Sequence, residues 1–324
     1  MARGVIGIDF SGSADQWKPG KKASNVWLAL GELDGGRLWI NELKPVQALE
    51  GDGPPFERLI DLLGASDAVV GIDASFGVPK DYASSVVELW ASVAALPADK
   101  RPFATARQLV DLLAPDAGAH GLKVYRQCEE QCRQLGLNVR SNLWNGPRGG
   151  AAFTVACMTL LHRHTGPVWP LRPGGEGALL VEAFPAAQLK TWGLDPERYN
   201  GATPAARKAR VVILEGLVRE HALRASDEIF WACVESADAL DAVICAYAAR
   251  TLAEGRHPRR LPSVARVEGW IVVDEPRIPA PANERRTEER PMEGLVDGAT
   301  QLIVQQLFDR AFEAVASQRP ARSA

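Results

Sequence analysis

Two apolar runs near the start of the chain each lead into an aspartate. Residues 4–10 (GVIGIDF) contain Asp9 before their last residue, and residues 67–73 (DAVVGID) end in Asp73. Continuous apolar runs of this length are typical of buried central strands, and the aspartate then stands at the carboxyl end of each strand. The pattern predicts two buried strands that each deliver a carboxylate to the same kind of position.

The segment between these two runs predicts a hairpin and a helix. Residues 25–33 and 37–43 have strand-like spacing and flank Asp34-Gly35-Gly36, and an Asp-Gly pair between strands is a hairpin signal. Residues 56–63 (FERLIDLL) have helical apolar spacing. The predicted order is therefore strand, hairpin, helix, strand.

Short helical patterns separated by Pro and Gly clusters replace the strands over residues 82–177. Because another apolar strand pattern follows at 178–184 (ALLVEAF), we interpret this region as a helical insertion and not as a separate domain. The four helices expected in it are 82–96, 103–113, 125–135 and 151–162.

The rest of the chain predicts two long helices, a last strand and a tail. Residues 205–223 and 237–252 have amphipathic helical spacing, and residues 267–273 look like a strand. We therefore predict an α/β domain over 1–275. Residues 276–291 are rich in Pro and charge, which indicates a linker. Residues 292–324 are expected to hold a helix that packs on the domain or joins two copies in a homo-oligomer.

Composition favours an ordinary soluble protein. Of the 324 residues, 46% are hydrophobic and 24% are charged. We expect no signal peptide, because an apolar run with an Asp follows one Arg, and no membrane contact, because no run approaches a membrane span. The five cysteines lie in apolar patterns, so we expect reduced, buried thiols in the cytoplasm, including Cys128 and Cys132 at i and i+4.

The charge of the chain is uneven. The formal net charge is −3, which counts against a protein that coats nucleic acid without specificity. Residues 119–178 contain seven Lys or Arg and three Glu, so this segment carries +4 and the remainder −7. A locally basic cleft in the insertion is therefore compatible with the acidic total.

Four aspartates are candidates for a shared site. Open α/β sheets place ligands at the carboxyl ends of their strands, where Asp9 and Asp73 are expected. Asp238 and Asp241 are three residues apart in the predicted helix 237–252 and share one helix face. The adjoining face of that helix has small residues that let it approach a sheet closely, namely Ala242, Cys245, Ala248 and Ala249.

A set of carboxylate oxygens suits Mg²⁺ or Mn²⁺. Two such ions can hold the attacking and leaving oxygens of a phosphoryl displacement, so no nucleophilic side chain is required. A G-x-S-x-G nucleophile motif is absent from the sequence, which agrees with this chemistry.

Several motifs in order resemble one family. They are Gly7-Ile8-Asp9 with Ser11, Gly71-Ile72-Asp73-Ala74 with Gly77 and Pro79, Val181-Glu182-Ala183-Phe184-Pro185, Asp238 to Asp241-Ala242, Glu268-Gly269-Trp270-Ile271, and an insertion motif of Arg126, Cys128 and Glu129. Together they span residues 4–273 and resemble the uncharacterised proteins described as predicted RNase H-like nucleases, domain-of-unknown-function family 429. The Asp241-Ala242 pair also looks like the last catalytic motif of RuvC-type resolvases.

The resemblance implies an RNase H-like core and a set of roles. It implies a five-stranded sheet with Asp9 on the first strand, Asp73 on the fourth, Glu182 on the fifth and Asp241 on the final helix. The expected metal ligands are Asp9, Asp73, Asp238 and Asp241, and Glu182 is expected to be a further ligand or a water-orienting base. The residues expected to bind the substrate are Ser11, Arg126 and Arg148.

The expected function is a metal-dependent nuclease or phosphodiesterase acting on nucleic acid or a nucleotide. Three alternatives stay open from the sequence. Glu182 could instead pair with Arg126, the domain could be a scaffold that binds without turnover, or the chain could be a phosphotransferase of the actin and sugar-kinase superfamily. That superfamily needs two RNase H-like halves, and the sequence shows one set of strands.

Overall fold

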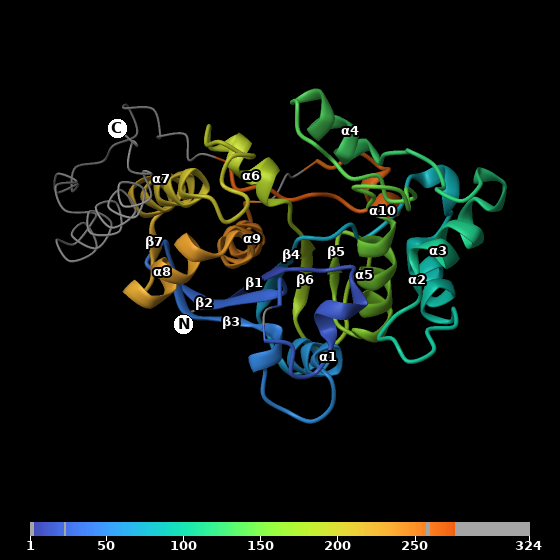
Figure 1. Ribbon diagram of the computed structural model, residues 1–324, viewed down its shortest axis with the longest axis horizontal. Helices are drawn as coiled ribbons and strands as arrows, with labels where there is room; N and C mark the ends of the chain where they lie inside the picture. Colours follow the sequence, from blue (N-terminus) through green and yellow to red (C-terminus); the bar gives the residue numbers. More distant parts are fainter. Residues whose placement is uncertain (1–2, 23, 257–259, 276–324) are drawn as a thin grey trace, which may run out of the picture.

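A mixed sheet runs through the middle of the molecule (Figure 1). The computed structural model describes residues 3–22, 24–256 and 260–275. Within these ranges the sheet has seven strands, in the spatial order β5 (Val168–Trp169), β6 (Leu179–Glu182), β4 (Val69–Ile72), β1 (Arg3–Asp9), β2 (Trp27–Asp34), β3 (Arg37–Pro45) and β7 (Leu223–Arg224). The predicted α/β class is confirmed.

The predicted hairpin consists of β2 and β3, which pair antiparallel up to Asp34 and Arg37. Gly35 and Gly36 form the turn with φ angles of +53° and +76°, a left-handed backbone that glycine adopts without steric cost. β1 pairs antiparallel with β2 and parallel with β4, and β4 pairs parallel with β6. This topology places the strands that precede Asp9 and Asp73 side by side in the centre of the sheet.

Different helices cover the two faces of the sheet. Along β1, Ile6 and Ile8 pack into one core, and Val5 packs into the other, as the alternation of side chains in a strand requires. The first core is completed by α1 (Pro55–Ala65), α2 (Val86–Ala94), α3 (Ala106–Leu113) and α5 (Ala151–Arg163). The second is completed by α6 (Pro185–Thr191), α7 (Pro204–Glu220), α8 (Asp227–Glu235) and α9 (Ala237–Ala253).

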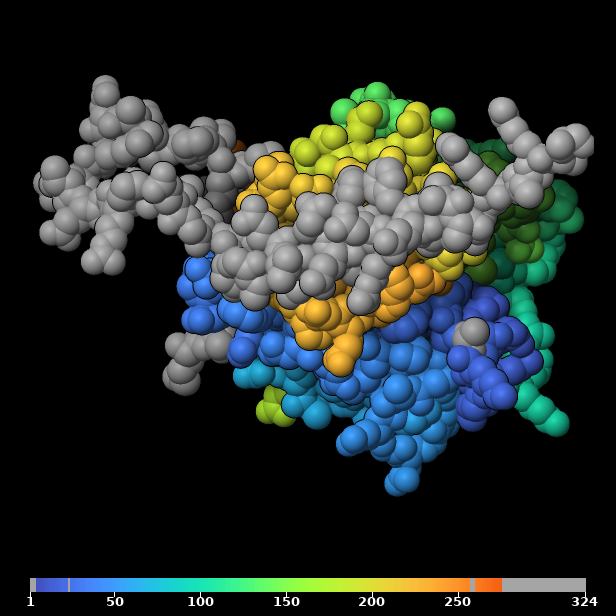
Figure 2. Space-filling view, turned by 60° about the vertical axis from the view of Figure 1, so that its left-hand side comes forward, coloured from blue at the N-terminus to red at the C-terminus, as the bar shows by residue number. Residues whose placement is uncertain are grey.

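Helix α9 lies in direct contact with β1 and β4. A Cβ atom added at Gly7 would lie 2.0 Å from the Ala242 carbonyl oxygen, and one at Gly71 would lie 2.1 Å from the Cys245 carbonyl oxygen. Glycine at these two positions therefore permits the close approach of helix and sheet. Figure 2 shows the C-terminal part of the chain, in yellow and orange, lying against the blue N-terminal part.

The four helices predicted between β4 and β6 are confirmed as α2, α3, α4 (Gln127–Gln134) and α5. Trp90 of α2, Val110 of α3 and Met158 of α5 belong to the same core as Ile8 of β1. The insertion is therefore built onto one face of the sheet and shares its core. The segment between β4 and β6 also contains β5 and two short 3₁₀ turns, Lys80–Tyr82 and Pro115–Ala117. Two further 3₁₀ turns, Ala14–Trp17 and Val46–Ala48, lie before β4.

Three expectations about the sheet are wrong. The sheet has seven strands and not five, because β5 and β7 add two-residue edge strands, too short to leave a pattern in the sequence. Glu182 consequently lies on the sixth strand, β6. The strand predicted at 267–273 is replaced by a helical turn, α10 (Ala265–Glu268), and a single bridge between Ile271 and Glu182. Gly269, with φ of +83°, ends that turn.

The remaining expectations divide between tested and untested. The five cysteines are buried free thiols, as expected. Within the described ranges no helix is both long and apolar enough to cross a membrane. The linker expected at 276–291 and the helix expected in 292–324 lie outside the described residues, so the homo-oligomer through that helix stays a prediction.

Candidate carboxylate site

Asp9 and Asp73 are neighbours at the carboxyl edge of the sheet. β1 and β4 pair in parallel up to Ile8 and Ile72, and the Asp73 amide then donates to the Ile8 carbonyl at 3.0 Å. Asp9 follows Gly7 by two residues, and Asp73 follows Gly71 by two, and residues two apart in a strand share one face of the sheet. Because the two glycines contact α9, the side chains of Asp9 and Asp73 lie on the face that α9 covers. The strand-end positions predicted from the sequence therefore converge.

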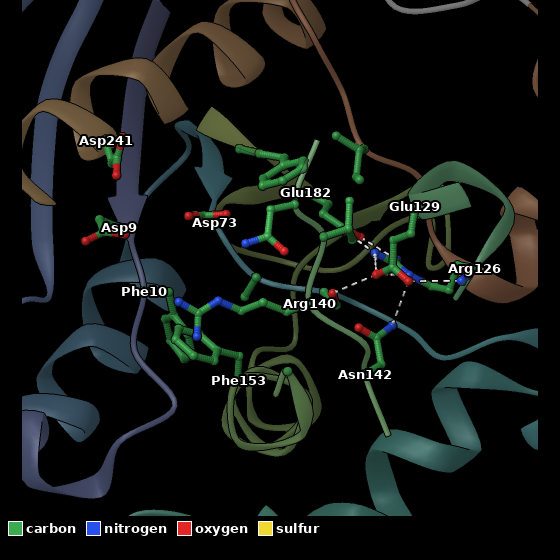
Figure 3. A pocket seen from close by; sticks show the side chains of 18 of the residues that line it. Asp9, Phe10, Asp73, Arg126, Glu129, Arg140, Asn142, Phe153, Glu182 and Asp241 are labelled. Atoms are coloured by element: carbon green, nitrogen blue, oxygen red, sulfur yellow. Dashed lines mark hydrogen bonds and ion pairs between the residues drawn. The ribbon is translucent and has the colours of Figure 1, made fainter. Parts of the chain in front are cut away.

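Helix α9 brings two more carboxylates to this edge. Ser236 caps the helix by accepting from the Ala239 amide, which fixes its start just before Asp238 and Asp241. The Tyr199 hydroxyl donates to Asp241 Oδ1 at 2.8 Å. Figure 3 shows the Asp241 carboxylate directed toward Asp9, with Asp73 on the neighbouring strand. These four aspartates are called the carboxylate cluster below.

Burial and mutual repulsion raise the pKa values of the cluster. Burial raises the pKa of Asp9 well above its usual value, and the charges of Asp241, Asp73 and Asp238 add to the effect. Burial raises the pKa of Asp73 to about 7, although the Arg140 guanidinium opposes it. Burial followed by the Asp73 charge does the same to Asp241, whose pKa is also raised well above its usual value.

Among the described residues, no hydrogen bond or ion pair reaches the side chains of Asp9 and Asp73. Within the same ranges, no three or more His, Cys, Asp or Glu side chains are close enough to surround a metal ion as they stand. The cluster thus consists of the buried Asp9 and three half-buried aspartates, and Asp9 and Asp73 have no counter-charge in contact. Its donor atoms are the carboxylate oxygens that Mg²⁺ and Mn²⁺ prefer.

Glu182 lies on the other side of the sheet from the cluster. Its neighbour Leu180 packs into the core under α5, whereas Val181 packs into the core with α9. Glu182 therefore faces the insertion, where the Arg126 guanidinium donates to both of its carboxylate oxygens, from Nη1 to Oε2 at 2.7 Å and from Nη2 to Oε1. The pairing that the sequence left open as an alternative is the arrangement present.

Arg126 is the centre of a buried network. Its side chain is 0% exposed and also donates from Nε to Glu129 Oε1 at 2.9 Å and from Nη1 to the Glu268 carbonyl at 2.9 Å. Ser75 Oγ donates to Glu129 as well, at 3.1 Å. The guanidinium connects the insertion, β6 and the α10 turn, so it holds these three parts of the chain together next to the site.

A cavity of about 260 Å³ connects the cluster with this network. Arg140 lines it, with its guanidinium 4.9 Å from the Phe153 ring centre, and Figure 3 shows this side chain extending over Phe153 toward Asp9 and Asp73. Within the described residues no acidic side chain forms an ion pair with Arg140. Arg140 is therefore a cation that faces Asp9 and Asp73 of the cluster.

Two predicted substrate-binding residues lie apart from the cavity lining. Arg148 is exposed in the loop before α5, with φ of +57°. Ser11 is 2% exposed, and its hydroxyl accepts from the Ser13 amide at 3.2 Å as part of the turn after β1. No motif singled out Tyr199 or Phe153, and Arg140 was visible only as one of several basic residues. Their contribution depends on tertiary contacts.

The family model of the proteins of unknown function DUF429 matches residues 24–266, which is most of the chain. The chain belongs to this family, as its motifs predicted. The matched region contains Asp73, Glu182 and both α9 aspartates, and it begins after Asp9. No curated protein and no solved structure matches the chain.

Proposed function

We propose that this protein is a metal-dependent hydrolase of phosphodiester bonds, a nuclease whose carboxylate cluster binds Mg²⁺ or Mn²⁺. The observation that carries the proposal is the convergence of Asp9, which is buried, with the half-buried Asp73 and Asp241 at the carboxyl edge of the sheet, without a basic partner in contact among the described residues. Ionised carboxylates are rarely buried unless they are paired or bound to metal.

We further propose that the core is RNase H-like. Support comes from the five longer strands, in the order β3-β2-β1-β4-β6, in which β2 runs in the opposite direction to the other four. Helix α9, the last long helix of the described residues, lies against β1 and contributes Asp241, as the family resemblance implies. The five buried thiols favour a reducing, cytoplasmic location.

The residues that line the cavity have different roles in this proposal. A divalent cation held by Asp9, Asp73 and Asp241 would supply Lewis acidity and charge neutralisation at the phosphoryl oxygens. Arg140 binds a phosphate oxygen from the side of Phe153, where its charge faces the cluster. The Arg126 network keeps the floor of the cavity rigid. Without a bound cation, the carboxylates of Asp9, Asp73 and Asp241 are expected to lie apart, because like charges repel.

An activity screen tests the proposal. Full-length protein is incubated with single-stranded and duplex DNA, RNA, an RNA–DNA hybrid and bis(p-nitrophenyl) phosphate, with Mn²⁺, with Mg²⁺ or with EDTA. We expect cleavage of at least one substrate that EDTA and Asp9→Asn, Asp73→Asn or Asp241→Asn each abolish. The control is Asp52→Asn, which removes the charge of an exposed Asp and should have no effect. Binding of metal without any cleavage would favour the scaffold alternative.

The phosphate role of Arg140 has its own test. Arg140→Ala should weaken nucleic-acid binding and reduce the log-log salt dependence of affinity by about 0.7 to 0.9 for the lost contact. Arg37→Ala is the matched control, because Arg37 is exposed next to the hairpin turn, at the opposite end of β1 from Asp9. Equal salt slopes for Arg140→Ala and Arg37→Ala would contradict the assignment. Arg148→Ala shows whether contacts extend beyond the cavity.

A further inference from the structure

Tyr199 reaches the carboxylate cluster from a segment that no motif marks. It lies between α6 and α7 and is 3% exposed, whereas its neighbours Arg198 and Asn200 are exposed. Its ring packs in the same core as Leu189 of α6 and Leu240 of α9. The phenol is thus fixed by packing, with its hydroxyl 2.8 Å from Asp241 Oδ1.

The hydrogen bond from Tyr199 is the contact that orients Asp241. Within the described residues it is the one side-chain hydrogen bond that this carboxylate receives. A donor on one oxygen restricts rotation of the carboxylate and leaves the second oxygen available to a ligand. Figure 3 shows the carboxylate directed toward Asp9 in this orientation. Hydrogen bonds of this kind commonly orient metal ligands in proteins.

Arg210 holds the segment that carries Tyr199. Arg210 lies on α7 with 0% exposure and donates from Nη1 to the backbone carbonyls of Tyr199 and Gly201, the second at 2.9 Å. Its Nε donates to the Val234 carbonyl at the end of α8, at 2.7 Å. One guanidinium therefore ties the Tyr199 segment to two helices through backbone atoms.

We propose that Tyr199 is a positioning residue for Asp241 and that Arg210 acts through Tyr199 by anchoring its backbone. The proposal rests on the proposed function, because it assigns to this pair the orientation of a metal ligand. The competing interpretation is a core tyrosine whose hydroxyl is satisfied by the nearest acceptor. That interpretation predicts a loss of stability on removal of the hydroxyl but no change in metal affinity.

Metal titration separates these interpretations. The dissociation constant of Mn²⁺ is measured by calorimetry or by electron paramagnetic resonance of free Mn²⁺, on full-length protein. Tyr199→Phe removes one oxygen and should weaken Mn²⁺ binding by about 10- to 100-fold, the usual effect of losing a partner of a metal ligand. Tyr247→Phe is the matched control, because Tyr247 is a buried tyrosine of the same core whose hydroxyl donates to the His221 carbonyl at 3.3 Å.

A double-mutant cycle tests the link to Arg210. Arg210→Lys keeps the positive charge but cannot donate to three carbonyls in the same geometry. It should weaken Mn²⁺ binding in the wild-type background and have little further effect when combined with Tyr199→Phe. Additive effects would overturn the part of the proposal in which Arg210 acts through Tyr199.

The outcomes for the function and for this inference are distinguishable. If the wild type binds no Mn²⁺, the proposed function fails and the inference fails with it. If the wild type and Tyr199→Phe bind Mn²⁺ with equal affinity, and Asp241→Asn binds it weakly, the function stands and the inference is overturned. The inference is supported if Tyr199→Phe binds Mn²⁺ more weakly than the wild type and Tyr247→Phe binds it with unchanged affinity.

Discussion

The side of the sheet that each acidic residue faces determines its surroundings. Asp9 and Asp73 lie two residues after Gly7 and Gly71, which contact α9, so their carboxylates lie on the same side of the sheet as Asp241. Glu182 sits at the end of the adjacent strand but faces the opposite side, where Arg126 neutralises it. Four acids at one edge of a sheet therefore form two different environments, one without a counter-charge in contact and one fully paired.

The metal-free protein should lose stability as the pH rises from about 4 to about 7. Burial raises the pKa of Asp73 from 3.8 to about 7, so the folded state binds a proton more tightly than the unfolded state. The stabilising contribution is complete below the unfolded pKa and disappears as the pH rises through the folded pKa. Urea unfolding in EDTA across this range should show a smaller loss for Asp73→Asn than for wild type. A loss equal to that of wild type would contradict the assigned environment.

Glu182→Gln should destabilise the fold whether or not metal is present. Removing one partner of a buried ion pair typically costs about 3–5 kcal/mol, because the other charge stays buried. Arg126 would keep Glu129 but lose its bidentate partner. Denaturation with and without Mn²⁺ checks this: the free energy of unfolding should fall while the Mn²⁺-induced increase persists. A rise in metal-free stability together with loss of the Mn²⁺ response would instead make Glu182 a ligand.

The sequence predicted the convergence of Asp9, Asp73 and Asp241, because strand ends and a small-residue helix face are visible in the residue pattern. It left the partner of Glu182 open. The side of the sheet that Glu182 faces, relative to Asp9 and Asp73, depends on how strands far apart in the sequence pair. Tyr199 gave no local signal of a role, and Arg140 was visible only as one of several basic residues of the insertion. Tyr199 reaches the cluster through core packing, and Arg140 faces it through the path of the insertion.

At the scale of elements, the contact between α9 and the sheet is what forms the cluster. Gly7 and Gly71 let the helix backbone approach the strands, and the short Asp241 side chain can then reach the sheet edge. The small-residue face of the helix was predicted from the sequence, whereas the role of Gly7 and Gly71 in this contact was not. The strands of four or more residues were predicted, whereas β5 and β7 were not, because two-residue edge strands are defined by their neighbours.

The strand predicted at 267–273 failed for a tertiary reason. The Glu268 carboxylate accepts from the Lys80 amide at 2.9 Å and the Gln127 amide at 2.8 Å. These bonds hold the α10 turn against the insertion, and the chain extends only after Gly269. Apolar spacing alone favoured a strand there, and the contacts of Glu268 lie far away in sequence.

Gly7→Ala should separate α9 from β1 and weaken the site without touching a carboxylate. The added Cβ would lie 2.0 Å from the Ala242 carbonyl, so the helix must shift, at a typical cost of about 1–3 kcal/mol. Mn²⁺ affinity should fall along with stability. Gly64→Ala in α1 is the control, because its Cβ would meet no atom within 4 Å and alanine favours helix. Unchanged metal affinity in Gly7→Ala would contradict the role of this contact.

At the scale of the whole molecule, the site is assembled from all three parts of the chain. The N-terminal strands supply Asp9 and Asp73, the insertion supplies Arg140 and the Arg126 network, and the C-terminal helices supply Asp241. The insertion shares the core of the sheet, which holds Arg140 beside the acidic cluster. This convergence agrees with the positive charge of the 119–178 segment in an otherwise acidic chain.

The central claim is that the cluster is a metal site, and the melting temperature as a function of Mn²⁺ tests it most directly. Ligand bound only to the folded state stabilises it by about 2.7 kcal/mol at a hundredfold excess over Kd. Millimolar Mn²⁺ should therefore raise the melting temperature of the wild type. Asp9→Asn should melt higher than wild type in EDTA, because repulsion is relieved, and should not respond to Mn²⁺, whereas Asp52→Asn should behave like wild type. A wild type whose melting temperature ignores Mn²⁺, or an Asp9→Asn variant that keeps the full response, would contradict the account.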